Sequence, residues 1–476
     1  GSQKNSKRAF EIAYDDIRKS FAYFDSGEFL SDIRTLIKIP TESQTKGGLK
    51  HCEKYLREAI SPVFKKMGFG TKMFANPVNG FGPVLLATRI EDPSLPTILG
   101  YGHGDVILGM EERWADSRNP WIVEVDGERV YGRGTADNKS QHWINIIALK
   151  HTLETRGALG FNAKFVVETG EENGSLGLGD VIAQNLDDFK ADVFIASDGP
   201  RVKRDFPTIC LGSRGAINFD LVCDLRTGGH HSGNWGGALR DPAIILSNAI
   251  SCISSSNGKI DVEEWRPPEI TPQTRDLLRD IKIDSGPGGP IPDDEWGEPG
   301  LTAAENVYAW NNFCVLAMIS GNPAQPVNAV SPSARAHCQF RYIAGTDHTN
   351  ALTALRKHLD ERGFGDVKIE APPEGNRGGY LASRTEPDNH WVERVIVSMT
   401  KTCSKAPAVI PQMGGSICND LFTDLLGLPA IWVPHSYSGC SQHAPNEHIL
   451  LPVCREGLQI MTGLYWDLGA VGSEEC

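Results

Sequence analysis

The chain of 476 residues lacks any long hydrophobic run. Its longest apolar stretches, such as Val84–Ala87 and Phe313–Ile319, are far shorter than the ~20 residues that a membrane-spanning helix needs. Basic residues are also scarce, with 47 Lys and Arg against 60 Asp and Glu and a net charge of −13. Nucleic acids and anionic membranes both require a basic surface, so we expect neither as the main partner.

Cysteine pairs of the C-x-x-C kind are absent, and the 11 cysteines are odd in number and scattered along the chain. This pattern argues against a disulfide framework and favours a reducing compartment. No apolar segment follows the first residues, so no signal peptide is visible. We therefore expect a cytoplasmic protein.

The composition that remains is that of a globular protein, with 40% hydrophobic and 22% charged residues. Enough apolar surface is available to exclude disorder as the main state, and the length favours two domains. Short β-like runs alternate with helical stretches in the first part, which predicts an α/β sheet with parallel strands. The predicted strands are Val84–Ile90, Thr97–Tyr101, Ala163–Glu168 and Val193–Ala196, and the predicted helices are residues 49–67 and Asn138–Thr155.

The pattern changes after Gly212 and returns to the α/β type from about Pro387. The intervening strands and helices predict an α+β insert, in which the acidic, proline-rich stretch Pro267–Pro299 is expected to be a surface loop. The predicted elements of the insert are Ala216–Leu225, Asp241–Ser255, Ala334–Tyr342, Thr349–Arg362 and Asp366–Glu370, followed in the last part by His390–Lys401 and Ala430–Val433. We therefore divide the chain into residues 15–212 and 375–476, forming one domain, and residues 213–374, forming the insert.

Acids and histidines gather directly after the predicted strands. Ligands bind outside the carboxyl ends of strands in open α/β sheets, so such side chains can converge on one point. Taken singly, each has an ordinary explanation, such as a helix N-cap or a turn, but glycine-flanked acids at four successive strand ends have no structural need to be acidic. The set comprises His103, Asp105, Asp137, Glu171, Glu172, Asp198 and His443.

Two imidazoles and several carboxylates suit zinc or a similar ion. Three acids and two histidines suffice for two metals if one carboxylate bridges them. Asp105 lies two residues from His103 and can fix the tautomer of a metal-bound imidazole. One acid of the Glu171–Glu172 pair remains free as a general base for an attacking water.

These segments resemble the zinc-dependent family of acetylornithine deacetylase, succinyl-diaminopimelate desuccinylase, aminoacylase, glutamate carboxypeptidase and carnosinase-type dipeptidases. The resemblance runs from about residue 30 to 470, and one departure is Asn138, where the family often has a second aspartate. The matching segments are Gly102–Asp105, Tyr131–Lys139, Glu168–Ser175, Ser197-Asp198, Ser213–Gly215, His231–Gly233, Arg341, Gly414–Ser416 and Gln442-His443.

The resemblance implies a role for each candidate residue and a fold for the chain. The fold is α/β, with a mixed-sheet zinc-peptidase catalytic domain interrupted by a smaller α+β lid or dimerisation domain, residues 213–374. His103 and Asp198 would bind one zinc, Glu172 and His443 the other, and Asp137 would bridge them. Asp105 would orient His103, and Glu171 would be the general base and acid. His231 would reach the active site of the partner subunit in a homodimer formed through the lid, and Arg341 would take a substrate carboxylate with help from Gly414, Gly415 and Ser416.

The expected function is hydrolysis of an amide or peptide bond in a small carboxylate-bearing substrate, of the dipeptidase or carboxypeptidase type. Two Zn²⁺ ions per subunit, with Mn²⁺ or Co²⁺ as substitutes, would hold a bridging hydroxide that attacks the carbonyl. A deacylase of N-acyl amino acids, or another small-molecule amidohydrolase, remains an alternative because the same groups cut either amide. A metal-binding scaffold without catalysis is a lesser alternative, against which Glu171 argues, since that residue is not needed to hold metal.

Overall fold

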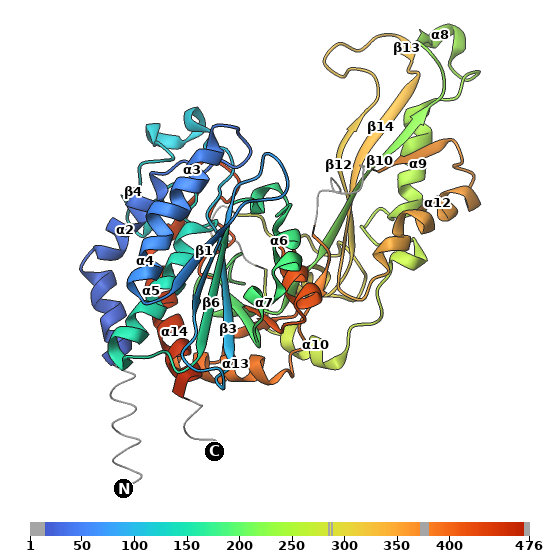
Figure 1. Cartoon of the computed structure of the whole chain (residues 1–476). Coiled ribbons are helices and arrows are strands. Elements are labelled where there is room, and N and C mark those ends of the chain that lie inside the picture. Colours follow the sequence, from blue (N-terminus) through green and yellow to red (C-terminus); the bar gives the residue numbers. More distant parts are fainter. Residues whose placement is uncertain (1–14, 284–285, 287–288, 372–379, 471–476) are drawn as a thin grey trace.

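The computed structural model describes residues 15–283, 286, 289–371 and 380–470. Its larger lobe is built on an eight-stranded mixed sheet (Figure 1). The four central strands, β6, β3, β7 and β18, run parallel to one another. On one side of them the pairing is antiparallel, between β6 and β2 and between β2 and β1. In spatial order the strands are β1 (Gly70–Phe74), β2 (Val84–Arg89), β6 (Asn162–Glu168), β3 (Thr97–His103), β7 (Val193–Ala196), β18 (Ala430–Trp432), β8 (Thr208–Cys210) and β17 (Ala408–Ile410).

Both faces of this sheet are covered by helices, so its central strands are buried throughout. One hydrophobic cluster lies on each face of the sheet. On β6, the side chains of Phe165 and Val167 belong to the first cluster and that of Val166 to the second, because successive side chains of a strand point to opposite faces. The first cluster packs against α5, α13 and α14, and the second against α6. These helices are α5 (Lys139–Arg156), α6 (Leu178–Gln184), α13 (His390–Cys403) and α14 (Leu451–Ala470).

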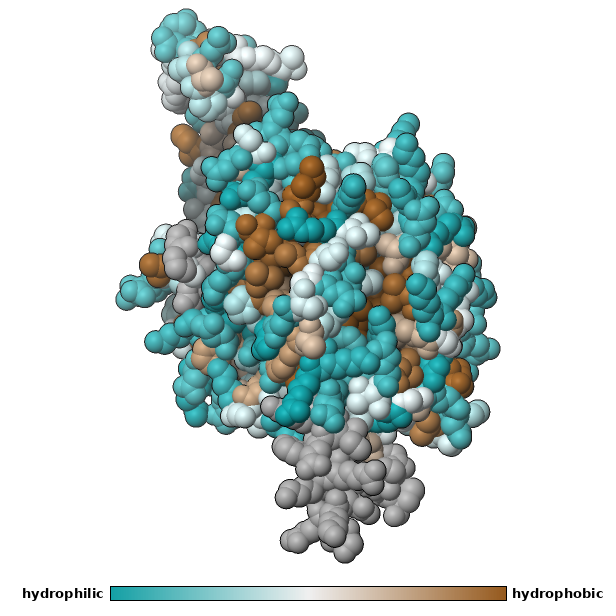
Figure 2. Space-filling model, turned by 90° about the vertical axis from the view of Figure 1, so that its left-hand side faces the viewer, coloured by the Kyte–Doolittle hydropathy of each residue, from teal (hydrophilic) through white to brown (hydrophobic). Residues whose placement is uncertain are grey.

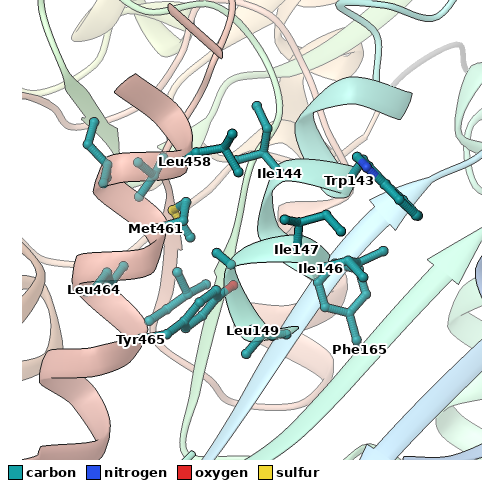
Figure 3. Close-up of a cluster of buried hydrophobic side chains, with 14 of the residues drawn as sticks. Trp143, Ile144, Ile146, Ile147, Leu149, Phe165, Leu458, Met461, Leu464 and Tyr465 are labelled. Atoms are coloured by element: carbon teal, nitrogen blue, oxygen red, sulfur yellow. The ribbon is translucent and has the colours of Figure 1, made fainter. Parts of the chain in front are cut away.

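Helices α5 and α14 lie side by side and form the centre of the larger core (Figure 3). Ile144 and Ile147 of α5 and Leu458 and Met461 of α14 are all at most 2% exposed. The amino-terminal elements α2 (Glu28–Ile37), α3 (Gly48–Lys54), a π-helical turn (Tyr55–Ile60) and α4 (Ser61–Lys66) extend the same layer. This packing fixes the first turn of α5, which begins two residues after Asp137.

The smaller lobe is an antiparallel sheet in the order β12-β14-β10-β15, with α9 (Pro242–Ile253) and α12 (Ala351–Glu361) packed on it. Its core contains Trp265, whose indole stacks on Phe340 at a ring distance of 4.2 Å. The strands are β10 (Gly215–Asp224), β12 (Asn312–Ile319), β14 (Ser333–Tyr342) and β15 (Val367–Glu370). At the far end of this lobe lie β11 (His230–His231), β13 (Ala329–Val330) and α8 (Ser232–Trp235), remote from the large sheet (Figure 1).

Two short strands connect the lobes and pair with each other. β9 (Gly212–Ser213) leads out of the larger lobe, and β16 (Ser383–Arg384) leads back into it. A Cβ on Gly212 would lie 2.0 Å from the carbonyl oxygen of Ser383, so this close pairing requires glycine. The two-lobed α/β architecture predicted from the sequence is confirmed.

The predicted strands and helices are found within a few residues of their expected bounds, and the helix predicted over residues 49–67 is present as α3, the π-helical turn and α4. The loop prediction for Pro267–Pro299 was wrong in part, because Pro272–Leu278 forms helix α10. Thr271 caps this helix by accepting a hydrogen bond from the N–H of Thr274. Pro272 at its first position is compatible with a helix start, so the proline that suggested a loop is a helix signal here.

No helix within the described residues is both long and apolar enough to cross a membrane. The face shown in Figure 2 is mainly hydrophilic, with apolar side chains gathered near its middle. Polar surface of this kind agrees with the acidic composition.

Candidate active site

The acids and histidines predicted from the sequence converge at the carboxyl ends of the central strands. β3 ends at His103, and β7 is followed by Asp198. After β6, the chain turns through a short 3₁₀ helix, Glu171–Asn173, which carries Glu171 and Glu172. Three parallel strands therefore deliver their side chains to the same edge, as expected for an open α/β sheet.

Asp137 stands between the two histidines. Its Oδ1 lies 2.9 Å from Nε2 of His103, and its Oδ2 lies 2.9 Å from Nε2 of His443. On the first side, Oδ2 of Asp198 lies 3.5 Å from Nε2 of His103. On the second side, Oε2 of Glu172 lies 3.0 Å from Nε2 of His443. The two carboxylate oxygens of Asp137 thus face two separate half-sites, each completed by one histidine and one acid.

The donor set fits a pair of divalent metal ions. Ligand atoms of His103, Asp137, Glu171 and Glu172 all lie within 4.8 Å of one another. Burial, and then the charge of Glu172, raise the pKa of Glu171 well above its usual value. Hydrogen bonds to Asp137 and Glu172 raise the pKa of His443 to about 11. So many acids in a buried space call for positive charge, and imidazole nitrogen with carboxylate oxygen is the ligand chemistry of zinc.

Asp105 joins the histidine to the Glu171–Glu172 turn. Its Oδ1 lies 3.3 Å from Nδ1 of His103, the ring nitrogen that faces away from the half-site. Its two oxygens also accept hydrogen bonds from the N–H groups of Glu171, at 3.2 Å, and Glu172, at 3.0 Å. The hydroxyl of Ser43 donates a further hydrogen bond to this carboxylate at 2.7 Å. Asp105 can therefore orient both the imidazole of His103 and the turn that carries Glu171 and Glu172. The sequence predicted its contact with the imidazole but not its contact with the turn.

A cavity of about 900 Å³ extends from this cluster to Arg341. Nη1 of Arg341, on β14, donates a hydrogen bond to the hydroxyl of Ser416 at 2.9 Å. Gly414 and Gly415 line the same cavity. The structure thus brings the predicted carboxylate-binding residues into one space with the predicted metal ligands.

His231 is the one candidate that lies far from this cavity in its own chain. It is exposed on β11 at the end of the smaller lobe, and its Nδ1 accepts a hydrogen bond from the N–H of Gly233 at 3.1 Å. Its role across a subunit interface stays a prediction.

Two further residues secure the ligand loops. The sequence marked Asn138 only as a departure from the family beside Asp137, and it assigned Glu447 no role. Asn138 accepts a hydrogen bond from the N–H of His103 at 3.2 Å and donates one to the carbonyl of Ser197 at 2.8 Å. It thereby ties together the loops of three candidate ligands.

Glu447 is the second of these residues. Its Oε2 accepts hydrogen bonds from the N–H groups of Gly134, Ala136 and Asp137, at 3.0, 3.0 and 3.1 Å. Its Oε1 accepts another from Nη1 of Arg133 at 3.0 Å. In the sequence, the one sign that Glu447 belongs to the site is its position four residues after His443. Its partner Arg133 is 314 residues away in the chain, so their pairing could not be read from the sequence.

Comparison with known proteins gives a consistent result. The model of Peptidase family M20/M25/M40 matches residues 99–467. The Beta-Ala-His dipeptidase of Rattus norvegicus is 32% identical over 212 residues, which make up 42% of this chain and 42% of that protein. The Cysteinylglycine-S-conjugate dipeptidase of Corynebacterium striatum is 28% identical over 333 residues, 68% of this chain and 70% of that protein. The match thus spans less than half the length of the rat protein.

Solved structures share the architecture. The M20 family metallo-carboxypeptidase Sso-CP2 from Sulfolobus solfataricus superposes with a TM-score of 0.77 and 26% identity, covering 93% of this chain and 99% of that one. Human carnosine dipeptidase 1 superposes with a TM-score of 0.73 and 19% identity, covering 95% of this chain and 100% of that one, which shows the same fold. Because the family match spans well over half of the chain and includes all the strand ends described above, the chain belongs to the metal-dependent peptidase family M20/M25/M40.

Proposed function

We propose that the protein is a di-metal hydrolase that cleaves the amide or peptide bond of a small carboxylate-bearing substrate, of the dipeptidase or carboxypeptidase type. One observation carries the proposal. Two half-sites sharing Asp137 open into the same cavity as Arg341. A substrate can therefore present an amide to the cluster while its carboxylate is held by the guanidinium through two parallel hydrogen bonds.

The metal ions we propose are two Zn²⁺ per subunit, with Mn²⁺ or Co²⁺ as substitutes. His103 and Asp198 would hold one, Glu172 and His443 the other, and Asp137 would bridge. Bound there, they would supply Lewis acidity that polarises a carbonyl and acidifies water.

Glu171 is the proposed general base. Its carboxylate lines the cavity but is not needed to complete either half-site. It would accept the proton of the attacking water and pass it to the leaving nitrogen.

The decisive test is turnover of a panel of dipeptides and N-acyl amino acids by metal-replete protein, with and without chelator. Cleavage of dipeptides that is lost in chelator and restored by Zn²⁺ supports the proposal. Faster cleavage of N-acyl amino acids would favour the deacylase alternative, which the mainly apolar cavity wall between the cluster and Arg341 also accommodates. Full activity in chelator would contradict a metal-dependent mechanism.

We further propose that residues 15–212 and 375–476 form the catalytic domain, that residues 213–374 form a lid, and that the lid makes a homodimer. Strand β12 supports the dimer, because it lies at the edge of the lid sheet with an apolar, exposed surface. Leu316 is 54% exposed and Ile319 is 59% exposed. An unprotected apolar edge of this kind is a liability in a monomer and suits pairing with a second copy.

A dimer would also give His231 a function, because the exposed lid end could donate it to the partner's active site as an oxyanion donor. Mixing a His231→Ala subunit with a Glu171→Gln subunit tests this. Mixed dimers should recover part of the activity, since one of their two sites would have both groups. Demonstrated mixed dimers without recovery would exclude a role across the interface.

A cytoplasmic location is the remaining part of the proposal. All ten cysteines within the described residues are free thiols, which agrees with a reducing compartment.

A further inference from the structure

A segment of the smaller lobe crosses over to the larger one. We call the described residues 266–283, 286 and 289–311 the strap; they lie between the turn Glu263–Trp265 and strand β12. Its helix α10 packs against β17, the edge strand of the large sheet. Leu278 and Trp310 of the strap belong to the hydrophobic cluster on that face of the sheet. The strap is therefore anchored to the larger lobe, although it lies within the insert.

The strap also forms part of the cavity wall. Ile283, Val307 and Tyr308 line the cavity, and the last two belong to helix α11 (Ala303–Tyr308). A Cβ added to Gly414 would lie 2.8 Å from Cγ1 of Val307, so the valine packs directly on this glycine. Helix α11 begins with a capping box at Thr302, which stabilises its first turn.

Val307 lies beside the predicted carboxylate site. Gly414 is two residues from Ser416, whose hydroxyl accepts the hydrogen bond from Arg341. Since Val307 and Arg341 line the same cavity, we expect a substrate residue whose carboxylate is bound by Arg341 to place its side chain near Val307.

Charge is unevenly distributed over the cavity wall. Among the described lining residues, the charged side chains are the acids and histidine of the metal cluster at one end and Arg341 at the other. The surface between them is largely apolar, with Ile283, Val307, Met413 and Ile417. A lysine side chain would find no acid in this part of the wall and would lie near the guanidinium of Arg214, whose Nη2 is 3.3 Å from a Cβ placed on Gly414. An aspartate side chain would compete with the substrate's own carboxylate for Arg341, whereas an apolar side chain would gain free energy by leaving water.

We propose that the strap makes an apolar subsite for the residue that carries the free carboxylate. The preferred substrates are then peptides or N-acyl amino acids that end in a large apolar residue, such as leucine or phenylalanine, and not in aspartate or lysine. This inference rests on the proposed hydrolase function and adds the substrate class.

The test compares Ala-Leu, Ala-Phe, Ala-Gly, Ala-Asp and Ala-Lys with the metal-replete full chain. We expect kcat/KM for Ala-Leu and Ala-Phe to exceed that for Ala-Asp and Ala-Lys by at least about 10-fold, since even one methylene in an apolar pocket changes discrimination by about 10-fold or more. Cleavage of all five at similar rates would overturn the subsite but leave the hydrolase function standing. Cleavage of none of these, nor of the N-acetyl derivatives of the same five carboxyl-terminal amino acids, would overturn both.

Variants of Val307 identify the wall itself. Val307→Thr replaces one methyl group by a hydroxyl of nearly the same size, so it should lower the preference for Ala-Leu over Ala-Lys several-fold with an unchanged fold. Val307→Asp should reverse more of the preference, because it offers a partner to lysine. Ile291→Asp is the matched control, since Ile291 is on the same strap and is 87% exposed outside this cavity. A preference unchanged in both Val307 variants, or altered equally by the control, would exclude the strap as the determinant.

Discussion

Replacing Glu447 by glutamine tests whether a buried ion pair secures the loop that carries Asp137. The carboxylate of Glu447 is 1% exposed and its partner Arg133 is not exposed at all. Its two oxygens accept four hydrogen bonds, three from backbone N–H groups and one from the guanidinium. Glutamine has nearly the same shape but only one accepting oxygen. Whichever way its amide is turned, an NH₂ group faces a donor.

The magnitude follows from burial. The substitution leaves Arg133 charged and unpaired in the interior, and breaking a buried ion pair in this way costs about 3–5 kcal/mol. Glu53→Gln is the matched control, because Glu53 pairs with Arg57 at a similar distance, 2.8 Å, but both side chains are more than half exposed. Exposed pairs of this kind contribute less than about 1 kcal/mol.

Urea unfolding of the metal-free variants gives the two free energies of unfolding. Working without metal separates the stability of the loop from the energy of metal binding. The reasoning that burial makes this pair matter would be refuted if Glu447→Gln lowered the free energy of unfolding by less than about 1 kcal/mol. It would also be refuted if Glu53→Gln lowered it by as much as Glu447→Gln does.

Three further predictions concern the site and the pH dependence. Glu171→Gln should retain metal and lower kcat by about 10²–10⁴-fold, whereas Glu172→Gln should lower metal content measured by elemental analysis; exchanged phenotypes would reverse these roles. Arg341→Lys should weaken the preference for free carboxylates over amides in kcat/KM, because lysine cannot bind through two parallel hydrogen bonds; a wild type that cleaves both equally would remove this role. Burial raises the pKa of Asp16 to about 7, so the folded chain binds this proton more tightly than the unfolded chain and stability falls between about pH 4 and 7. Asp16→Asn should flatten the fall in Tm over that range, and the exposed Asp15→Asn should not; equal slopes would contradict the assignment.

The positions of the candidate ligands could be predicted because each follows a strand of its own. A run such as Val193–Ala196 is buried on both faces, so its β character is visible locally, and the acid after it lies at the strand end whatever the rest of the chain does. The order of the strands, which decides that these ends meet, was not predicted from the sequence and is seen only in the structure.

Features that depend on distant partners were not predictable. Helix α14 was missed because it packs against both α5 and α13 and is apolar on several faces, which removes the one-sided period that marks a surface helix. Phe313–Ile319 has the composition of a buried strand, yet most of β12 is exposed at a sheet edge. This surface of β12 would be buried only against a second copy of the chain, and a sequence pattern does not show whether a strand is buried within its own chain or between two chains.

Glu447 and Asn138 both support the loop of Asp137, the residue that the two half-sites share. Under the proposed assignment, Asp137 belongs to both half-sites, so any displacement of its loop disturbs two metal ions together. Glu447 and Asn138 both act on this loop, the first through its N–H groups and the second as the next residue, which also contacts the backbone of His103. Variants of these two residues should therefore weaken both metal sites in parallel, whereas Glu172→Gln should weaken one before the other. The ratio of one to two bound metals at limiting zinc distinguishes a disturbed loop from a lost ligand, even where total activity falls equally.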